Sequence, residues 1–439
     1  MVVSAHPEAS RIGVEILKKG GNAVDAAIAV QFALAVVFPA AGNLGGGGFL
    51  VYRSADGKNL QTIDFREKAP AQAHETMYQD AKGNILTGLS VNGGLASGTP
   101  GSVEGMWQVH QKLGTITWKD LLQPAIEIAN KGVLLTEKEA EGLNRNKNAF
   151  KKYNPDYKSA FVREQDWKKD DLLVQPELGH TLELIRDLGR DGFYRGETAE
   201  KIVNTMRMTG GLISYADLLL YDAVWRQPMT MIYKNHTIIA MPPPSSGGVA
   251  MFQLLKIVEK YKLKAMGWQT PQTVHLLAEA ERRVYADRAT HLGDPDFWEV
   301  PVENLLNEKY LTKRMQNFDS LQATPSAQIE AGIFAGAESD QTTHFSVVDK
   351  KGNAVAVTTT LNGGYGSKVV VRGAGFFMNN EMDDFSIKPG VPNIYGVTGG
   401  KANAVAPYKR MLSSMTPSIV EKNGRLLMVV GTPGGSTII

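Results

Sequence analysis

The clearest alternation of apolar and polar positions lies in the stretch 342–361. Its first part, TTHFSVV, alternates β-branched and aromatic residues with polar ones, which is typical of a half-buried strand. The turn-forming residues DKKGN follow, and AVAVTTTL then resumes a strand pattern, so we predict a β-hairpin. If Val348 faces Ala354 across the loop, Thr342 lies opposite Thr360, with their Cβ atoms about 4.5–5.5 Å apart.

This pairing has a chemical consequence for the first threonine of the hairpin. A threonine hydroxyl is a poor nucleophile unless a base lies beside it, and one solution uses the residue's own α-amino group, freed by cutting the preceding peptide bond. Here that bond joins Gln341 to Thr342. The local sequence alone favours the simpler interpretation, in which TTH opens an edge strand.

Elsewhere the hydrophobic pattern predicts an alternation of helices and strands. Apolar residues at helical spacing predict helices over 6–19, 23–41, 103–113, 118–130, 177–188, 196–209, 214–221, 249–261 and 273–292, and alternating or β-branched runs predict strands over 49–53, 60–65 and 231–240. The helix 23–41 is apolar on nearly all sides, which indicates that other layers cover it. For the helix 273–292 we expect solvated charges beside a packed apolar face.

Composition limits the classes of function. The 439 residues suffice for two or three average domains or for one large layered fold, and the net charge of +2 provides no basic field for nucleic acid. Without cysteine there are no disulfides, thiolate nucleophiles or cysteine-ligated metals. We find no apolar run long enough for a transmembrane helix and no signal-peptide pattern at the start, and we expect that a signal was removed before residue 1.

Several local motifs imitate known sites. The glycine-rich run PAAGNLGGGG lacks the P-loop lysine, so we interpret it as close backbone packing. Ser245 and Ser246 in PPPSSGG lack a G-x-S-x-G frame, and we expect them to cap a helix. The zinc pattern H-E-x-x-H is absent. Arg66, just after a predicted strand, is either a solvated charge or a clamp for a carboxylate.

Unusual polar positions accumulate after the hairpin. They occur in the runs NNEMDDFS, KRMLSSMTPS and GTPGGS, and each run alone is explained by turns and caps. Together with ESDQTTHFSVVDKKGNAVAVTTTLN, and with DFREKAPA, SGTPGSVEGM and PPPSSGG upstream, they resemble the bacterial γ-glutamyltranspeptidases over nearly the whole chain. That family belongs to the N-terminal nucleophile hydrolases, so the resemblance implies an α+β fold, a four-layer αββα sandwich, and self-cleavage into a large and a small subunit.

The resemblance also implies roles for individual residues. Thr342 would be the nucleophile, with cleavage between Gln341 and Thr342, and Thr360 would hydrogen-bond it. The remaining expected site residues are the oxyanion-hole amides of Gly434 and Gly435, the carboxylate ligands Arg66, Ser413 and Ser414, and the ammonium ligands Asn362, Glu381 and Asp384. The run 388–405 resembles a lid loop, with Tyr395 placed to bond Asn362.

The resemblance further predicts γ-glutamyl amides such as glutathione as donors, and water, amino acids or dipeptides as acceptors. An acylase of the same fold, acting on cephalosporin side chains or poly-γ-glutamate, is the alternative. No metal or cofactor is expected. The two subunits would be 1–341 and 342–439, forming one composite domain as a heterodimer, and the location would be periplasmic or secreted. Because family chains continue beyond GGS, we also expect that the C-terminal part of the small subunit is truncated.

Overall fold

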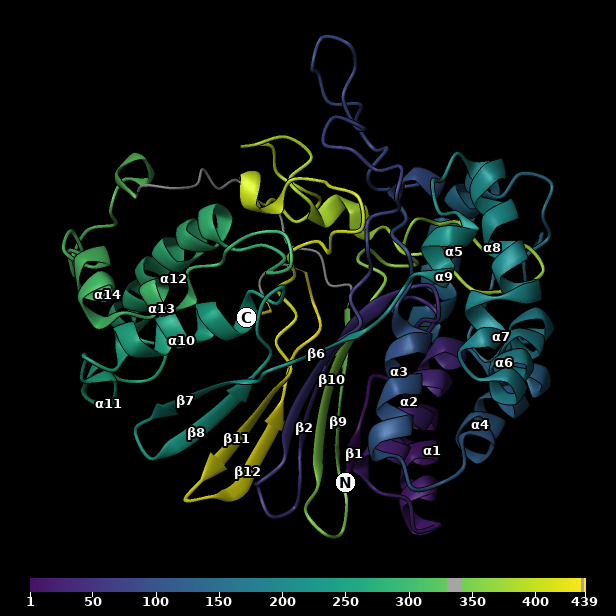
Figure 1. The fold of residues 1–439 in the computed structure, drawn as a ribbon, viewed down its shortest axis with the longest axis horizontal. Helices are drawn as coiled ribbons and strands as arrows, with labels where there is room; N and C mark the ends of the chain where they lie inside the picture. Colours follow the sequence, from purple (N-terminus) through teal and green to yellow (C-terminus); the bar gives the residue numbers. More distant parts are fainter. Residues whose placement is uncertain (330–341, 436–437) are drawn as a thin grey trace.

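Two antiparallel β-sheets lie face to face in the centre of the molecule, and helices cover the outer face of each (Figure 1). The computed structural model describes residues 1–329, 342–435 and 438–439. The larger sheet has the strand order β1-β9-β10-β2-β3-β6, and the smaller has the order β12-β11-β8-β7. This is the predicted four-layer αββα sandwich.

The elements have the following bounds. The helices are α1 Pro7–Lys18, α2 Ala23–Val37, α3 Ser102–Leu113, α4 Trp118–Lys131, α5 Glu137–Tyr153, α6 Pro176–Leu188, α7 Asp191–Tyr194, α8 Gly196–Thr209, α9 Tyr215–Leu219, α10 Gly247–Val258, α11 Leu263–Met266, α12 Pro271–His291, α13 Val302–Leu305 and α14 Glu308–Arg314. The strands are β1 Val2–Val3, β2 Gly47–Arg53, β3 Leu60–Asp64, β4 Val133–Leu134, β5 Leu172–Leu173, β6 Val224–Arg226, β7 Met229–Tyr233, β8 His236–Ala240, β9 Thr342–Val348, β10 Ala354–Thr360, β11 Ser418–Lys422 and β12 Arg425–Val430.

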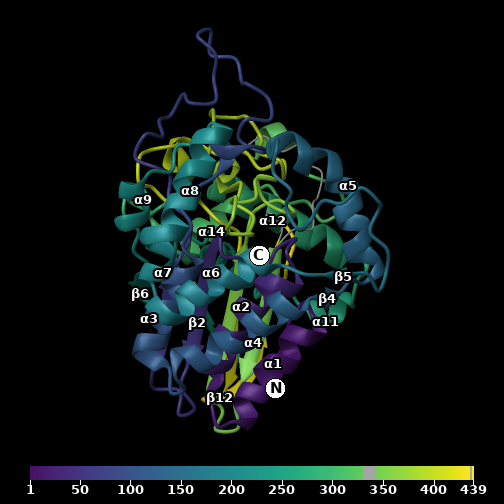
Figure 2. The same cartoon turned by 90° about the vertical axis from the view of Figure 1, so that its right-hand side faces the viewer.

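Strand β10 is buried on both faces because it lies in the middle of the sandwich. Val355 and Val357 point into the core formed with the helices α1–α4, whereas Ala354 and Ala356 pack against the second sheet. Helix α2 is buried along its whole length, as its all-round apolar sequence predicts, because it packs against α1, α4, β9 and β10. Figure 2 shows these helices stacked over the larger sheet.

The predicted strand 231–240 is wrong in one respect. The structure divides this region into β7 and β8, which form an antiparallel hairpin through Lys234 and Asn235. Lys234 adopts a φ of +54° in the turn. The turn was missed because the polar residues that interrupt the strand pattern, Lys234, Asn235 and His236, include no glycine or proline.

The predictions for helix α12 also need correction. Glu279 and Asp287 are buried rather than solvated. Glu279 forms ion pairs with Arg282 and Arg283, and Asp287 accepts a hydrogen bond from Gln253.

In the described part of the chain, no helix combines the length and apolar character needed to cross a bilayer.

Candidate active site

The hairpin that carries Thr342 has the predicted register. Strands β9 and β10 pair so that Val348 faces Ala354 and Thr342 faces Thr360, which confirms the position of the two threonines derived from the loop length. Phe345 on β9 points into the core on the helix side of the sheet. Because successive side chains of a strand point to opposite faces, the even-numbered residues of β9, including Thr342, face the second sheet. The hydroxyl of Thr360 accepts a hydrogen bond from the backbone N–H of Asn362 at 2.7 Å.

A glycine-rich loop supports the end of this hairpin by close backbone contact. A Cβ atom on Gly46 would lie 2.0 Å from the carbonyl oxygen of Thr360. Beside it, Asn43 donates a hydrogen bond to the same carbonyl oxygen at 3.0 Å. The interpretation of PAAGNLGGGG as a packing motif is therefore confirmed.

The side chain of Thr342 is held by a backbone amide from the second sheet. The N–H of Gly434, in the segment after β12, donates a hydrogen bond of 2.6 Å to Oγ1 of Thr342. Gly434 and Gly435 have φ values of +120° and +40°, which side chains rarely adopt. Two consecutive glycines thus allow the backbone to bend toward the threonine hydroxyl.

The neighbouring histidine does not contact this hydroxyl. The ring nitrogens of His344 lie 2.9 Å from Thr358 Oγ1 and 3.0 Å from Ser346 Oγ. Burial lowers the pKa of His344 to about 4. Within the described residues, no side-chain base is hydrogen-bonded to Thr342 Oγ1.

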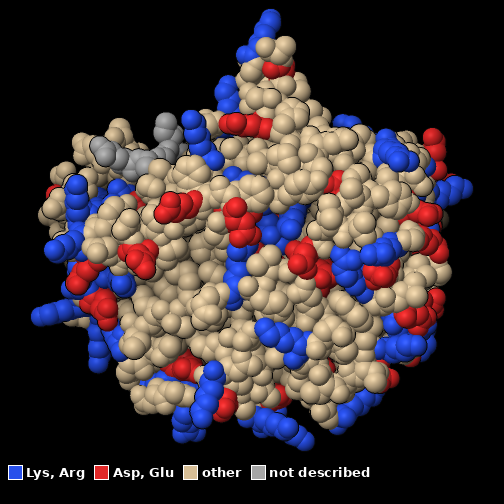
Figure 3. Space-filling model, viewed as in Figure 1, with Lys and Arg blue, Asp and Glu red and all other residues tan. Residues whose placement is uncertain are grey.

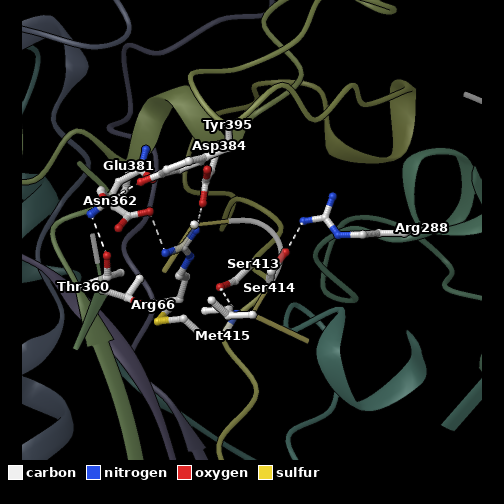
Figure 4. Close-up of a pocket in the computed structure, with 13 residues that line it drawn as sticks. Arg66, Arg288, Thr360, Asn362, Glu381, Asp384, Tyr395, Ser413, Ser414 and Met415 are labelled. Carbon is white, nitrogen blue, oxygen red and sulfur yellow. Dashed lines mark hydrogen bonds and ion pairs between the residues drawn. The ribbon is translucent and has the colours of Figure 1, made fainter. Parts of the chain in front are cut away.

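Thr342 lines a small polar pocket. Figure 4 shows the labelled residues of this pocket around Arg66. The volume of the pocket is about 280 Å³ including the open mouth. It brings together segments that are far apart in the sequence, and it is lined by Arg66, Arg288, Thr342, Thr360, Asn362, Glu381, Asp384, Tyr395, Ser413, Ser414, Met415, Gly435 and Ile438. Every expected site residue in the described part of the chain is in this lining except Gly434, which contacts Thr342 directly. Gln341 lies outside the described residues.

Arg66 is the central cation of the pocket and is fully buried. Its guanidinium group lies 2.6 Å from Glu381 and 2.5 Å from Asp384. The sequence-based assignment places Arg66 at one end of a ligand and these acids at the other, whereas here they contact one another. Burial lowers the pKa of Arg66, but the two carboxylates outweigh this effect and raise it.

A third carboxylate, Glu67, completes a buried acidic group around Arg66. It lies 3.7 Å from the guanidinium, and neither of its oxygens is hydrogen-bonded within the described structure. Burial raises the pKa of Glu67 to about 8, although Arg66 opposes the shift. Burial, together with the charge of Glu67, likewise keeps the pKa of Glu381 above its usual value, again against the effect of Arg66.

Ser413 and Ser414 are adjacent residues that also line the pocket. The hydroxyl oxygen of Ser413 accepts a hydrogen bond from the N–H of Met415 at 3.2 Å. That of Ser414 accepts one from Arg288 at 3.0 Å. Both hydroxyl groups are therefore held from inside the protein.

The capping role expected for Ser245 and Ser246 needs correction. Ser246 occupies the N-cap position of α10, but its side chain makes no capping hydrogen bond. It donates instead to the carbonyl oxygen of Ser413 at 2.7 Å. Ser245 donates to the carbonyl oxygen of Met415 and accepts from the N–H of Gly247, so it supports the same segment as well as the helix start.

The segment 388–405, which resembles a lid, forms several hydrogen bonds with residues at the pocket. The hydroxyl of Tyr395 donates to the carbonyl oxygen of Asn362 at 2.5 Å, as expected from the resemblance. Asn393 donates to Asp384 at 3.1 Å, and the N–H of Ile394 donates to Asp383 at 2.8 Å. Burial raises the pKa of Asp383 to about 6.

Sequence reasoning missed Arg288, Glu67 and Asp383. Arg288 lies on a helix whose charges appeared solvated, and nothing in its local sequence places α12 beside the pocket. Glu67 and Asp383 are adjacent in sequence to the predicted site residues Arg66 and Asp384. This adjacency was the signal that could have identified them. Among the residues that the structure describes, no group of side chains has the composition and geometry to hold a metal ion.

Comparison with known proteins is consistent with this arrangement. The family model described as Gamma-glutamyltranspeptidase matches residues 9–439. The chain belongs to this family.

Relatives and solved structures give the same assignment. The chain is 48% identical to the glutathione hydrolase proenzyme of Escherichia coli strain K12, over all of this chain and 76% of that protein. The crystal structure of Helicobacter pylori gamma-glutamyltranspeptidase matches with a TM-score of 0.72 and 43% identity, covering 75% of this chain and 95% of that chain. The Acylase ACY 1 proenzyme of Pseudomonas sp. strain SE83 is more distant, at 35% identity over all of this chain and 77% of that protein. The fold and the family are therefore those that the motifs indicated, and the chain is an enzyme of this group.

Proposed function

We propose that the protein is a self-processing γ-glutamyltranspeptidase and hydrolase, which cleaves γ-glutamyl amides such as glutathione through an acyl-enzyme on Thr342. One observation carries the proposal. The hydroxyl of Thr342, held by the Gly434 amide, lies at a pocket that contains a buried cation and buried carboxylates. This combination suits a substrate that carries both charges of an amino acid beside a reactive amide.

The charges of the pocket would recognise the glutamyl end of the donor. Its α-carboxylate would bind Arg66, Ser413 and Ser414, and its α-ammonium group would bind Asn362, Glu381 and Asp384. Such charge-assisted hydrogen bonds contribute roughly 1.5–3 kcal/mol each. The Arg66 contacts with Glu381 and Asp384 support this division, because a zwitterion offers one replacement partner for the arginine and another for the acids. Held at both charges, the donor presents its γ-carbonyl carbon to Thr342.

The reaction would proceed in two acyl-transfer steps. The α-amino group of Thr342 accepts the proton from its own hydroxyl as Oγ1 attacks the γ-carbonyl carbon. The N–H groups of Gly434 and Gly435 stabilise the oxyanion, and the amide C–N bond breaks as the leaving amine receives the proton. Water or the amino group of an acceptor then attacks the ester, which restores Thr342 and releases glutamate or a new γ-glutamyl compound. Thr360 would orient the nucleophile from the facing position on β10.

The base in this scheme exists only after the chain is cut before Thr342. We therefore propose autocatalytic cleavage between Gln341 and Thr342, which yields subunits 1–341 and 342–439 that together build the sandwich. Support comes from several relatives, which are named as proenzymes. The composite nature of the larger sheet supports it too, because β2 from the first segment pairs with β10 from the second. A periplasmic or secreted location is part of the same proposal.

An acylase would bind a substrate with different charges in this pocket. A glutaryl side chain has a carboxylate but no α-ammonium group, so the acidic wall would have no ligand to bind. Glu381 and Asp384 beside Arg66, and the bonded segment 388–405, favour a small γ-glutamyl donor.

The test compares two anilides that differ only in the α-amino group. Purified protein should release p-nitroaniline from γ-glutamyl-p-nitroanilide, and addition of glycylglycine should raise the rate by transfer. Glutaryl-p-nitroanilide should be a much poorer substrate. Preference for the glutaryl compound would instead support the acylase.

A further inference from the structure

Arg288 is a buried cation with no acidic partner in the described part of the chain. It extends from α12 to the pocket, and only 6% of its surface is exposed. The other buried arginine of the pocket, Arg66, is paired with carboxylates, whereas the hydrogen bonds of Arg288 go to Ser246 and Ser414. Burial accordingly lowers its pKa. Burial of a charge whose hydrogen bonds, among the described residues, go to hydroxyl groups is costly.

The direction of each hydrogen bond follows from the chemistry of the guanidinium group, which can only donate. Arg288 Nε donates to Ser246 Oγ at 2.9 Å, and Nη2 donates to Ser414 Oγ at 3.0 Å. Ser246 must then donate its own hydrogen, and it does so to the carbonyl oxygen of Ser413. One arginine therefore holds both members of the serine pair, Ser414 directly (Figure 4) and Ser413 through Ser246.

This network leaves the hydrogen atoms of the two serine hydroxyl groups without an acceptor in the described structure. Ser414 already accepts from Arg288, and Ser413 already accepts from the N–H of Met415. The hydrogen of each hydroxyl is thus available to donate to a group in the pocket. Two hydroxyl donors beside a positive charge match a carboxylate, and the positive charge repels an ammonium group.

We propose that Arg288 is a positioning residue that makes Ser413 and Ser414 selective for the α-carboxylate of the donor. It fixes the serine pair as outward donors, and it supplies a second positive charge at that end of the pocket. The inference rests on the proposed function and extends it, because it assigns carboxylate recognition to a residue on α12 that need not touch the substrate.

The experiment measures kcat and KM for two anilides in the processed enzyme. One is γ-glutamyl-p-nitroanilide, and the other is 4-aminobutanoyl-p-nitroanilide, which keeps the ammonium group and the amide but lacks the α-carboxylate. In Arg288→Met, KM for the glutamyl compound should rise about tenfold to a hundredfold, the range expected for loss of charge-assisted bonds. KM for the 4-aminobutanoyl compound should stay within about twofold, since no carboxylate is bound. The preference for the glutamyl compound should therefore fall by the same factor.

Two further variants separate positioning from general damage. Arg288→Lys keeps the charge but lacks the planar fork of donors, so its loss of preference should be intermediate, and it serves as the test if Arg288→Met does not fold or process. Arg282→Met, on the same helix and directed to Glu279, should keep the wild-type preference.

The outcomes are distinguishable. An unchanged preference in Arg288→Met and Arg288→Lys, or an equal rise of KM for both anilides, would overturn the inference. A wild-type enzyme that does not cleave γ-glutamyl-p-nitroanilide at all would instead refute the proposed function.

Discussion

The N–H of Gly434 and the hydroxyl of Thr342 are joined by a hydrogen bond of 2.6 Å, although 91 residues separate them in the chain. Gly434 follows the edge strand of the smaller sheet, and Thr342 begins a strand of the larger one. The sandwich thus aims a backbone donor from one sheet at a hydroxyl from the other. In the proposed reaction the N–H of Gly434 stops donating to the threonine oxygen and donates to the oxyanion that forms next to it.

This relationship predicts a large catalytic effect of Gly434→Ala. A side chain at a φ of +120° would force the backbone to rotate and move the N–H away from Thr342. Because removal of one oxyanion-hole donor costs about a hundredfold to a thousandfold in kcat, we expect a loss of that size. Steady-state kinetics with γ-glutamyl-p-nitroanilide measures it.

Gly424→Ala provides the matched control. Gly424 lies in the turn between β11 and β12 at a φ of +73°, and its added methyl group would meet no atom within 4 Å. It adds the same methyl group at another positive φ, away from the pocket, and should leave kcat near the wild-type value. A Gly434→Ala enzyme as active as this control would argue against the oxyanion role.

Arg66 should affect substrate binding and stability in separable ways. Arg66→Ala leaves Glu381 and Asp384 without their cation, and loss of one partner of a buried pair costs about 3–5 kcal/mol. Arg66→Lys keeps the charge but loses the two-pronged geometry, so it should fold more stably while KM for the donor still rises about tenfold or more. Thermal unfolding and KM are measured together, with Arg195→Lys, an exposed pair with Asp191, as control. An unchanged KM in both Arg66 variants would remove this residue from the carboxylate site.

Glu67 should make stability depend on pH. Its pKa is raised to about 8 in the folded protein, so its contribution to stability is fully present below the unfolded-state pKa of about 4.3 and is lost as pH rises toward 8. The slope from this group is at most about 1.4 kcal/mol per pH unit. Glu67→Gln removes the titration, and its free energy of unfolding should fall less between pH 5 and pH 8. Parallel wild-type and variant curves in denaturant titrations would contradict the assignment.

The segment carrying Tyr395 should contribute modestly to donor binding. Tyr395→Phe removes the hydrogen bond to the Asn362 carbonyl oxygen, and a neutral hydrogen bond contributes about 0.5–1.5 kcal/mol. We expect KM for the donor to rise about twofold to tenfold. Tyr408→Phe, at an exposed position in the neighbouring segment, should change nothing. Equal KM values in the two variants would show that this bond does not support the site.

The visible surface of the described residues has no large patch of one charge that would indicate a second binding site. Figure 3 shows acidic and basic side chains interspersed over the visible face, as the net charge of +2 suggests. Charged side chains are also buried inside the molecule, and Arg66 and Arg288 are the buried cations that line the pocket.

How far the sequence predicted the structure depended on whether the signal was local. The pairing of Thr342 with Thr360 could be derived because the loop DKKGN fixes the register of adjacent strands. The hairpin of β7 and β8 was missed because its turn, at Lys234 and Asn235, has Asn235 but no glycine beside it. Helix α2 was predicted well because a helix that is apolar all round must be covered.

The site was predicted through motifs and not through geometry. Periodicity alone could not have brought Arg66 to Glu381, because the two residues meet only when the segments following β3 and β10 fold over the same edge of the sheet. Arg288 was beyond reach for the same reason, since its partners lie on segments distant in the chain. The contact of Arg66 with the acidic side chains was also unforeseen, because sequence gives charge but not pairing.

The most direct test of the central claim is the intact mass and N-terminal sequence of the purified protein. We predict two fragments, with the smaller beginning at Thr342, and a single chain of about 47.8 kDa for Thr342→Ala. Thr342→Ser, which keeps a hydroxyl group, should still be cut. A wild-type protein that remains one chain yet cleaves γ-glutamyl-p-nitroanilide at full rate would contradict the central claim.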